Sequence, residues 1–525
     1  MNNENKDLSA LDFGKNAVGT ASSLMISKIT SVIILGLTFI FVARLLGSTN
    51  YGIYVLATAI IGLFDAMGNF GIGSAFNRFS AEYRDEPEKV NHLLINGFLI
   101  LLVIGLILSS LIFIFSGPLS IYTLHTIKYE YVLHYISFAV LTSMLFGASY
   151  PILIGLGKRK EAATSIFTQA IVQGVVSIAL ILLGFGVLGP IIGLLSGYLS
   201  SFVITIIFLI SLKKYHFVLP SIAWLKELFK FTIPIAISNI FHSLSGNLST
   251  VLLGVFTTAV ILGNFGIAFK INYIYDILLG SISLSLISTF TLIYNSKKVK
   301  SRLGEIYSYS VFLAMLFATP IAIFIILFSH SLIYLLFGNT YQLAPLYIQI
   351  ISLGIMIGIL PSFASTLLIS IKKVKDMMKN NIKIAIIEII IMPFAIYEFS
   401  GLGLVVLLFF IAPIISSLLF ITTLKKYVKL KIEINKILKL IIASIISVAI
   451  AYLLASNINY SSLQIIIGII LVIFIYPITL NILNALDESD INNLNRLSEN
   501  VVIVNSMLKF IINYYEKFKF LRLSR

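Results

Sequence analysis

A small set of ionisable side chains lies inside or at the ends of long apolar stretches, and these residues are the best candidates for a functional site. They are Lys28, Arg44, Asp65, His242, Lys270, Asp276 and Glu388. A charge at mid-bilayer costs about 2.5–3.5 kcal/mol on insertion scales, so such residues usually face a cavity or a partner. Lys28 and Lys270 would attract an anionic group, such as a phosphate or pyrophosphate, as point charges.

The acidic residues admit two interpretations. Asp65 and Asp276 would either tune the lysines or bind a coupling cation. The alternative is internal pairing of lysine and aspartate that only orients helices. Lys270 and Asp276 are six positions apart and face different sides of one helix, so they cannot simply satisfy each other. For Glu388 and His242, an interhelical hydrogen bond is the favoured interpretation.

The elements that carry these residues are predicted to be membrane-spanning helices. The chain has 525 residues, of which 58% are apolar and 11% charged, with a mean hydropathy of +1.02. About 20 apolar residues span a bilayer as a helix, and a helix satisfies its own backbone hydrogen bonds in lipid. We predict an all-α polytopic protein with about fourteen spans. Their ranges are 19–44, 50–75, 93–115, 131–156, 162–185, 187–211, 232–256, 258–290, 306–329, 344–371, 380–398, 401–424, 437–455 and 462–486.

Most of the 37 Lys and Arg residues fall in the tails and in every second gap between spans. The positive-inside rule therefore predicts a multi-pass cell-membrane protein with both termini in the cytoplasm. Basic loops beside a membrane contact anionic headgroups, so the net charge of +15 needs no nucleic-acid partner. The chain has no cysteine, so disulfides and thiolate metal sites are excluded.

Three short patterns recur at a spacing near 212 residues. They pair Gly52 with Gly263 (211), Phe115-Ser116 with Phe328-Ser329 (213) and Lys158-Arg159-Lys160 with Lys372-Lys373 (214). Three ordered matches indicate two parallel repeats of six spans, a design that transporters use with a substrate site between the halves. We expect a lobe at 1–212, an amphipathic cytoplasmic linker at 213–231, a second lobe at 232–426, two further spans in 427–486 and an amphipathic cytoplasmic tail at 487–525.

Patterns for enzymatic chemistry are missing or out of context. The sequence has no Walker A motif and no HExxH metal motif. The GxGxxG match at 184–189 follows no strand, and we interpret it as a tight turn between spans. Gly193 and Gly197 are interpreted as a helix-packing pair. The gaps on the outer side are too short for a catalytic domain. We therefore predict a non-enzymatic protein with no catalytic residue, metal site or cofactor.

Several segments resemble the lipid-linked oligosaccharide flippases, the polysaccharide-transporter branch of the multidrug/oligosaccharidyl-lipid/polysaccharide exporter superfamily. The similar segments are 43–54 (ARLLGSTNYGIY), 69–72 (NFGI), 78–82 (RFSAE), 251–254 (VLLG), 263–270 (GNFGIAFK) and 336–341 (LFGNTY). Lys270 stands where the family often has a basic residue. Ser249 and Asn69 stand where many relatives carry aspartate, which argues against a coupling role at these two positions.

This resemblance implies two six-helix lobes around a cationic cavity that opens alternately to each side. The cargo would be a polyprenyl phosphate- or pyrophosphate-linked glycan, moved from the inner to the outer leaflet. Lys28, Arg44 and Lys270, with Asp65, Asp276 and His242, would line the cavity. Glycosyltransferases or a polymerase of the same pathway are candidate partners, together with membrane lipids. The rival functions are a cation-coupled multidrug exporter of the same superfamily and a membrane glycan polymerase or glycosyltransferase.

Overall fold

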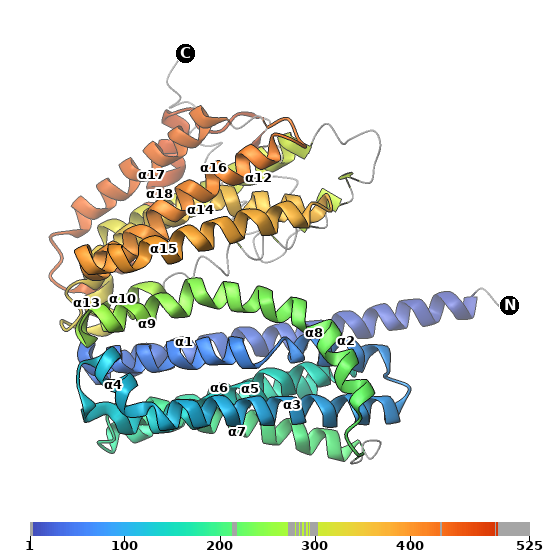
Figure 1. The fold of residues 1–525 in the computed structure, drawn as a ribbon. Coiled ribbons are helices and arrows are strands. Elements are labelled where there is room, and N and C mark those ends of the chain that lie inside the picture. The colour runs from blue at the N-terminus through green and yellow to red at the C-terminus, as the bar shows by residue number, and fades with distance from the viewer. Residues whose placement is uncertain are drawn as a thin grey trace. The chain divides into compact units, whose positions relative to one another are not determined.

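The computed structural model of the chain is helical throughout the part that it describes. It describes residues 4–212, 218–270, 303–430, 433–488, 490 and 491, with scattered positions between 279 and 294, and it gives only the backbone for 4–29 and for part of 234–245. No strand occurs in these residues, and ten of their helices are long and apolar enough to cross a membrane. The prediction of an all-α polytopic membrane protein is confirmed (Figure 1).

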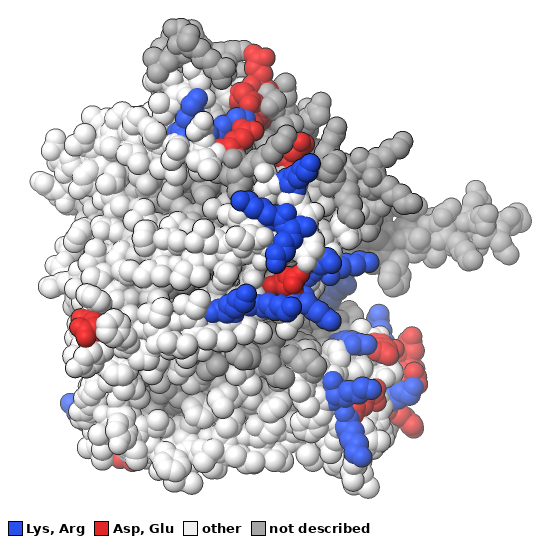
Figure 2. All heavy atoms as spheres, turned by 45° about the horizontal axis from the view of Figure 1, so that its top comes forward, with Lys and Arg blue, Asp and Glu red and all other residues white. Residues whose placement is uncertain are grey.

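The chain divides into two compact units, residues 1–263 (unit 1) and 264–525 (unit 2). The predicted lobe, linker and tail boundaries stay predictions. Large apolar side chains such as Ile107, Phe138 and Leu182 are more than half exposed. Figure 2 shows a broad uncharged surface on the face drawn, with most of the acidic and basic side chains gathered at its edge. Exposed apolar side chains on long helices are the surface that a lipid bilayer covers.

Helix α1 (Glu4–Gly68) contains the first predicted span and most of the second, and it doubles back between them. Gly47 has non-helical angles (φ 69°, ψ 172°) that glycine adopts without steric cost. The rings of Phe39 and Tyr51 lie 5.9 Å apart. In a straight helix, twelve residues would separate these positions by about 18 Å. We call the parts before and after Gly47 the first and second limbs of α1.

The second predicted span (50–75) is wrong at its inner end. The second limb ends at Gly68, and helix α2 begins after a break, at Ile72, and runs to Glu82. Phe70 and Gly71 have positive φ angles of 47° and 71°, which a continuous right-handed helix does not allow. Hydropathy does not detect such a break because it does not record backbone angles.

The rest of unit 1 is a series of helices, five of which are long, and the last of the series, α10, continues into unit 2. They are α3 (Pro87–Ile114), α4 (Ser116–Leu124), the 3₁₀ turn η1 (Ile127–Tyr129), α5 (Glu130–Gly155), α6 (Arg159–Leu182), α7 (Leu188–Ser211), α8 (Ile222–Ser243), the π-helical turn η2 (Leu244–Leu248), α9 (Ser249–Phe256) and α10 (Ala259–Lys270). Small residues let α6 and α7 approach closely. A Cβ atom on Gly193 would overlap Ser177 Oγ, and one on Gly197 would lie 2.8 Å from the Cβ of Gln173. The predicted packing role of this glycine pair is confirmed.

Unit 2 also consists of long helices joined by short helices and turns. Its elements are α12 (Leu303–Leu327), α13 (Ser329–Phe337), α14 (Ala344–Ser370), α15 (Val374–Val406), the π-helical turn η4 (Leu407–Ile411), α16 (Ala412–Leu424), α17 (Ile434–Ala455) and α18 (Ser461–Ile482). A break at Ser400 (φ 55°, ψ −141°) divides α15 between the predicted spans 380–398 and 401–424. The counted spans are fewer than fourteen partly because α1 and the stretch 374–424 each count once.

Two prolines inside helices of unit 2 leave carbonyl groups without their usual donor, and side chains from other helices replace it. Pro320 has no N–H for the carbonyl of Leu316, which accepts a hydrogen bond from the Tyr476 hydroxyl at 2.9 Å. Pro361 leaves the carbonyl of Ile357, which lies 3.3 Å from Ser417 Oγ and shares that hydroxyl with the carbonyl of Pro413 at 2.7 Å. In lipid an unsatisfied carbonyl is costly, so these hydroxyls stabilise the proline sites.

The sequence repeat has counterparts in local geometry. Helices α4 and α13 both have nine residues and start after a phenylalanine with nearly equal angles, φ −93° and ψ 14° at Phe115 and φ −94° and ψ 11° at Phe328. The elbows after α5 and α14 also match. Gly157 (φ 75°) precedes a Lys158 N–H···O=C Leu153 bond of 2.7 Å, and Lys372 (φ 61°) precedes the equivalent Lys373 bond of 2.8 Å. The elbow spacing is therefore 215, and the predicted 214 is wrong by one residue.

Gly52 and Gly263, the first predicted repeat pair, take part in one reciprocal contact. A Cβ atom on Gly52 would overlap the carbonyl oxygen of Ala259, and a Cβ atom on Gly263 would overlap that of Ser48. Ser48 and Ala259 are themselves 211 residues apart, so each copy of the pattern meets the other in the same way. Only glycine allows two backbones to approach this closely.

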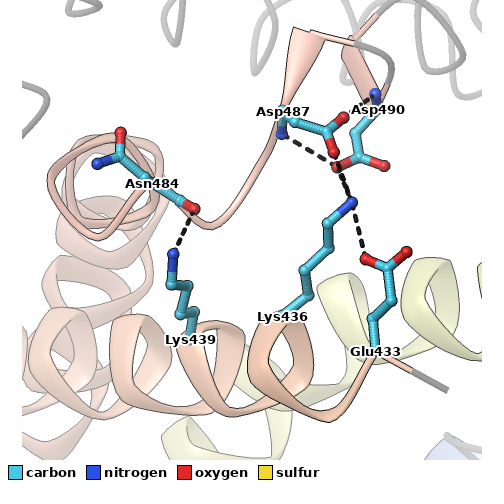
Figure 3. A network of polar contacts seen from close by, with 6 residues as sticks. All are labelled: Glu433, Lys436, Lys439, Asn484, Asp487 and Asp490. Atoms are coloured by element: carbon cyan, nitrogen blue, oxygen red, sulfur yellow. Dashed lines mark hydrogen bonds and ion pairs between the residues drawn. The ribbon is translucent and has the colours of Figure 1, made fainter. Parts of the chain in front are cut away.

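A polar network joins α17 to the segment after α18 (Figure 3). Lys436 Nζ lies 3.0 Å from Glu433, 2.6 Å from Asp487 and 3.1 Å from Asp490. The Asp490 side chain is 4% exposed. The two aspartates also cap each other's backbone, because Asp490 N–H donates to Asp487 Oδ1 (2.8 Å) and Asp487 N–H to Asp490 Oδ2 (3.0 Å).

We expect Lys436→Met to lower the stability of the protein by about 2–3 kcal/mol at neutral pH, because it leaves the Asp490 carboxylate buried without a cation. Burial raises the pKa of Asp490, while hydrogen bonds from the Asp487 backbone and Lys436 lower it. Without Lys436 this pKa rises further, so the loss should shrink as pH falls and the carboxyl is protonated. Thermal unfolding in detergent between pH 5 and 8 measures this. Lys429→Met, at an exposed position, is the control, and an equal loss there would contradict the prediction.

Candidate functional site

Asp65 is a carboxylate on the second limb of α1, within a segment long and apolar enough to cross the membrane. Gly62 and Asn69 lie three residues before it and four after it, so the three share one helical face. The Asp65 carboxylate accepts a hydrogen bond from Ser143 Oγ on α5 at 3.2 Å. The Asn69 side chain is its other hydrogen-bond partner. Within the described residues, Asp65 forms no ion pair.

The Ser143 hydroxyl has a second acceptor, the carbonyl of Val140 at 2.8 Å. A hydroxyl has one hydrogen, so its bond to Asp65 competes with this local bond. Gly147, one turn further along α5, makes room for Asn69. A Cβ atom there would lie 2.9 Å from Asn69 Nδ2. The Asp65 carboxylate thus accepts hydrogen bonds from neutral donors only. One of them, the Ser143 hydroxyl, also has a carbonyl of α5 as acceptor.

Helix α8 and the π turn η2 reach the same face of α1. Ser243 Oγ donates to the carbonyl of Gly62 at 3.3 Å, and Asn247 Nδ2 donates to Ser243 Oγ at 3.0 Å. Gly62 makes room for the Asn247 amide, since a Cβ atom there would lie 2.7 Å from Asn247 Nδ2. Single π turns inside α-helices are frequent at functional sites, and here the turn carries Asn247.

We call Asp65, Asn69, Ser143, Ser243 and Asn247 the polar cluster. It comprises two hydrogen-bond networks on neighbouring turns of α1: Asp65 with Ser143 and Asn69, and Ser243 with Asn247 and the Gly62 carbonyl. Carboxylate, amide and hydroxyl oxygens are the ligands of hard cations such as Na⁺, Mg²⁺ and Ca²⁺. A membrane carboxylate with neutral partners is also a candidate proton acceptor. The Asp65 carboxylate with its neutral partners is therefore chemically suited to bind a proton or a small cation.

The structure places the other predicted site residues as follows. Lys28 lies on the first limb of α1, nineteen residues before Gly47, while Asp65 lies eighteen residues after it, so their backbones are at similar distances from the bend. Arg44 is exposed beside that bend, and Asp65 lies roughly 27 Å from the bend along the second limb. Lys270 is exposed at the end of α10. In the described part of the chain, no Lys or Arg forms an ion pair with Asp65.

His242 and Asp276 cannot be placed in the same way. His242 is followed by Ser243 and the π turn, so its backbone adjoins the polar cluster, but its side chain is not described. Asp276 lies outside the described residues. Glu388, for which an interhelical role is predicted, is buried in α15 at 8% exposure.

Sequence reasoning found Asp65 but missed the serine and asparagine partners. Serine and asparagine are common in apolar helices, so each is unremarkable alone. The useful signal was the spacing, since Gly62, Asp65 and Asn69 share one face, and Ser243 and Asn247 are one turn apart.

The sequence matches two known protein families. Residues 18–293, more than half of the chain, match the model of a family described as polysaccharide biosynthesis protein. The chain belongs to this family. A second family model, MatE, matches residues 234–394. A search of curated proteins finds no match to the sequence.

Solved structures show that this family member shares its fold with flippases and exporters. A lipid II flippase, MurJ in an inward closed conformation, aligns with a TM-score of 0.69 and 17% identity over 87% of this chain and 98% of that one. An inward-facing multidrug resistance MATE family transporter of the MOP superfamily aligns at 0.63 and 15%, over 75% and 94%. A MOP superfamily transporter from Pyrococcus furiosus aligns at 0.51 and 15%, over 79% and 96%. At these identities the likeness concerns the fold alone.

Proposed function

We propose that the protein is a flippase that moves a lipid-linked oligosaccharide from the cytoplasmic to the outer leaflet. The observation that carries this proposal is the membership of the polysaccharide biosynthesis family, in a chain whose fold is that of a lipid II flippase. A glycan built on a membrane lipid in the cytoplasm must cross the bilayer before it is used outside. A polytopic member of this family suits that step, in which no bond is made or broken.

The mechanism follows from the cost of moving a sugar–phosphate group through hydrocarbon. Burying a polar group without hydrogen bonds costs several kcal/mol, and burying a charge costs more. A cavity that opens alternately to each side would replace the headgroup's water while the lipid tail stays in the bilayer. Lys28, Lys270 and Arg44 would hold the phosphate charge. Glycosyltransferases or a polymerase of the same pathway would supply and consume the cargo, and both termini would lie in the cytoplasm.

The test is headgroup accessibility in vesicles that contain the protein and a fluorescent lipid-linked oligosaccharide. Replacing both Lys28 and Lys270 with alanine should slow flipping at least tenfold, because a charge-assisted contact contributes about 1.5–3 kcal/mol. The matched control replaces Lys160 and Lys426, two exposed lysines, with alanine. Flipping at the normal rate in the Lys28 and Lys270 variant would contradict the cationic site.

A cation-coupled multidrug exporter is the second candidate. It is favoured by the MatE match to residues 234–394 and by the Asp65 carboxylate, since a cationic drug would need acidic walls. Uptake of a cationic dye into inverted vesicles separates the two functions. We expect no transport of the dye above that of empty vesicles. Transport of the dye without any flipping of the lipid-linked glycan would favour the exporter.

A further inference from the structure

Arg78 on α2 has its guanidinium group over two aromatic rings. The carbon of that group lies 4.7 Å from the centre of the Phe231 ring and 5.4 Å from that of the Phe79 ring. The two rings contact each other edge to face at 5.2 Å. Cation–π contact with two rings restricts where the guanidinium can lie, and its five N–H donors lie in its own plane.

The N–H edge of Arg78 is only weakly used by the protein. Its one ion pair in the described part of the chain is with Glu82, Nε to Oε2 at 3.8 Å, one turn along the same helix. Both side chains are about half exposed, at 58% and 49%. Exposed pairs of this kind contribute less than about 1 kcal/mol. Most of the five donors of Arg78 therefore remain available to a ligand.

Phe79 and Phe231 form an aromatic platform for Arg78. Phe231 belongs to α8, and the start of that helix contacts other parts of unit 1. The Ser221 N–H donates to Asn96 Oδ1 on α3 at 2.9 Å. Trp224 packs against Tyr83 at 5.6 Å and stacks on His92 at 6.2 Å. Trp and Tyr gather where a membrane meets water, and Trp224 and Tyr83 pack together at this end of unit 1. Phe231 lies two turns further along the same helix and contacts Phe79 there.

From this geometry we infer that Arg78, on its Phe79 and Phe231 platform, binds the pyrophosphate or phosphate of the lipid-linked substrate at headgroup depth before translocation. The inference rests on the proposed function and adds a residue outside the predicted cavity set. A guanidinium fork bonds two phosphate oxygens at once, which lysine cannot do. Stacking reduces the entropy lost on binding because the side chain is already ordered.

The binding experiment uses the full-length protein in phosphatidylcholine nanodiscs, with radiolabelled undecaprenyl pyrophosphate as the probe. We expect Arg78→Gln to weaken binding at least tenfold, Arg78→Lys to weaken it less, and Phe231→Leu to weaken it a few-fold through loss of the platform. Lys160→Gln, which removes a charge from an exposed lysine without an aromatic platform, should bind normally. Wild-type affinity in Arg78→Gln would overturn the inference.

Phosphatidylglycerol binding separates the substrate phosphate from bulk lipid. If Arg78→Gln weakens phosphatidylglycerol binding to the same extent, the site is a general headgroup site and the inference fails. Thermal unfolding checks that each variant is folded. If Arg78→Gln does not fold, Arg78→Lys and Phe231→Leu still test the inference.

The flipping assay separates this inference from the proposed function. Normal flipping by Arg78→Gln at all substrate concentrations would contradict the Arg78 binding site and support the proposed flippase function. Arg78-dependent binding in a protein that flips no lipid-linked glycan would support the binding site and contradict the proposed flippase function. If both hold, Arg78→Gln should raise the half-saturating substrate concentration about tenfold and leave the maximal rate unchanged.

Discussion

Gly52→Val is expected to abolish the folded protein or to lower its stability by more than about 3 kcal/mol. Its Cβ atom would overlap the carbonyl oxygen of Ala259 and lie 2.9 Å from the backbone nitrogen of Gly263. Both obstacles are backbone atoms on α10, so no side-chain rotation relieves the clash. Gly263→Val should behave in the same way, because its Cβ atom meets the carbonyl of Ser48.

The measurement is the yield of monodisperse protein in detergent, followed by its thermal unfolding temperature. Gly36→Val is the matched control, since it adds the same side chain to the same helix where nothing lies within 4 Å. Gly52→Ala should be intermediate. A Gly52→Val protein that purifies and unfolds like the wild type would show that the two backbones do not meet as described.

Asp65→Asn should slow flipping at least tenfold and largely remove its dependence on a cation gradient, while the protein stays folded. The amide keeps the size of the side chain and can still accept hydrogen bonds from Ser143 and Asn69, so packing is preserved. The only anionic group of the polar cluster is lost, however, and with it the attraction for a proton or sodium ion. Flipping in vesicles with imposed proton or sodium gradients measures the effect.

Two controls sharpen the Asp65 result. Glu398→Gln makes the same change of charge at an exposed position of α15 and should leave flipping unchanged. Ser143→Ala removes one donor to the carboxylate and should have a smaller effect than Asp65→Asn, because Asn69 remains. If Asp65→Asn flips at the normal rate under every gradient, the cluster is a structural hydrogen-bond network.

The sequence by itself determined the class of the protein. Apolar runs of membrane-spanning length dictate helices, because lipid offers the backbone no other partner. It also singled out Asp65, since a carboxylate in such a run is costly wherever its helix packs. The glycine at position 47 separates two of these runs, and the structure turns there. Hydropathy and charge are local properties, so they can be read without knowing which helices touch.

Only the tertiary structure decided which side chains meet. Ser143 and Asn247 join the polar cluster from helices 78 or more residues away in sequence, and Phe231 reaches Arg78 from the far end of unit 1. These meetings depend on how each helix is rotated about its axis. In a helix that is apolar on every side, the sequence pattern contains almost no record of that rotation, because lipid and a neighbouring helix accept the same residues.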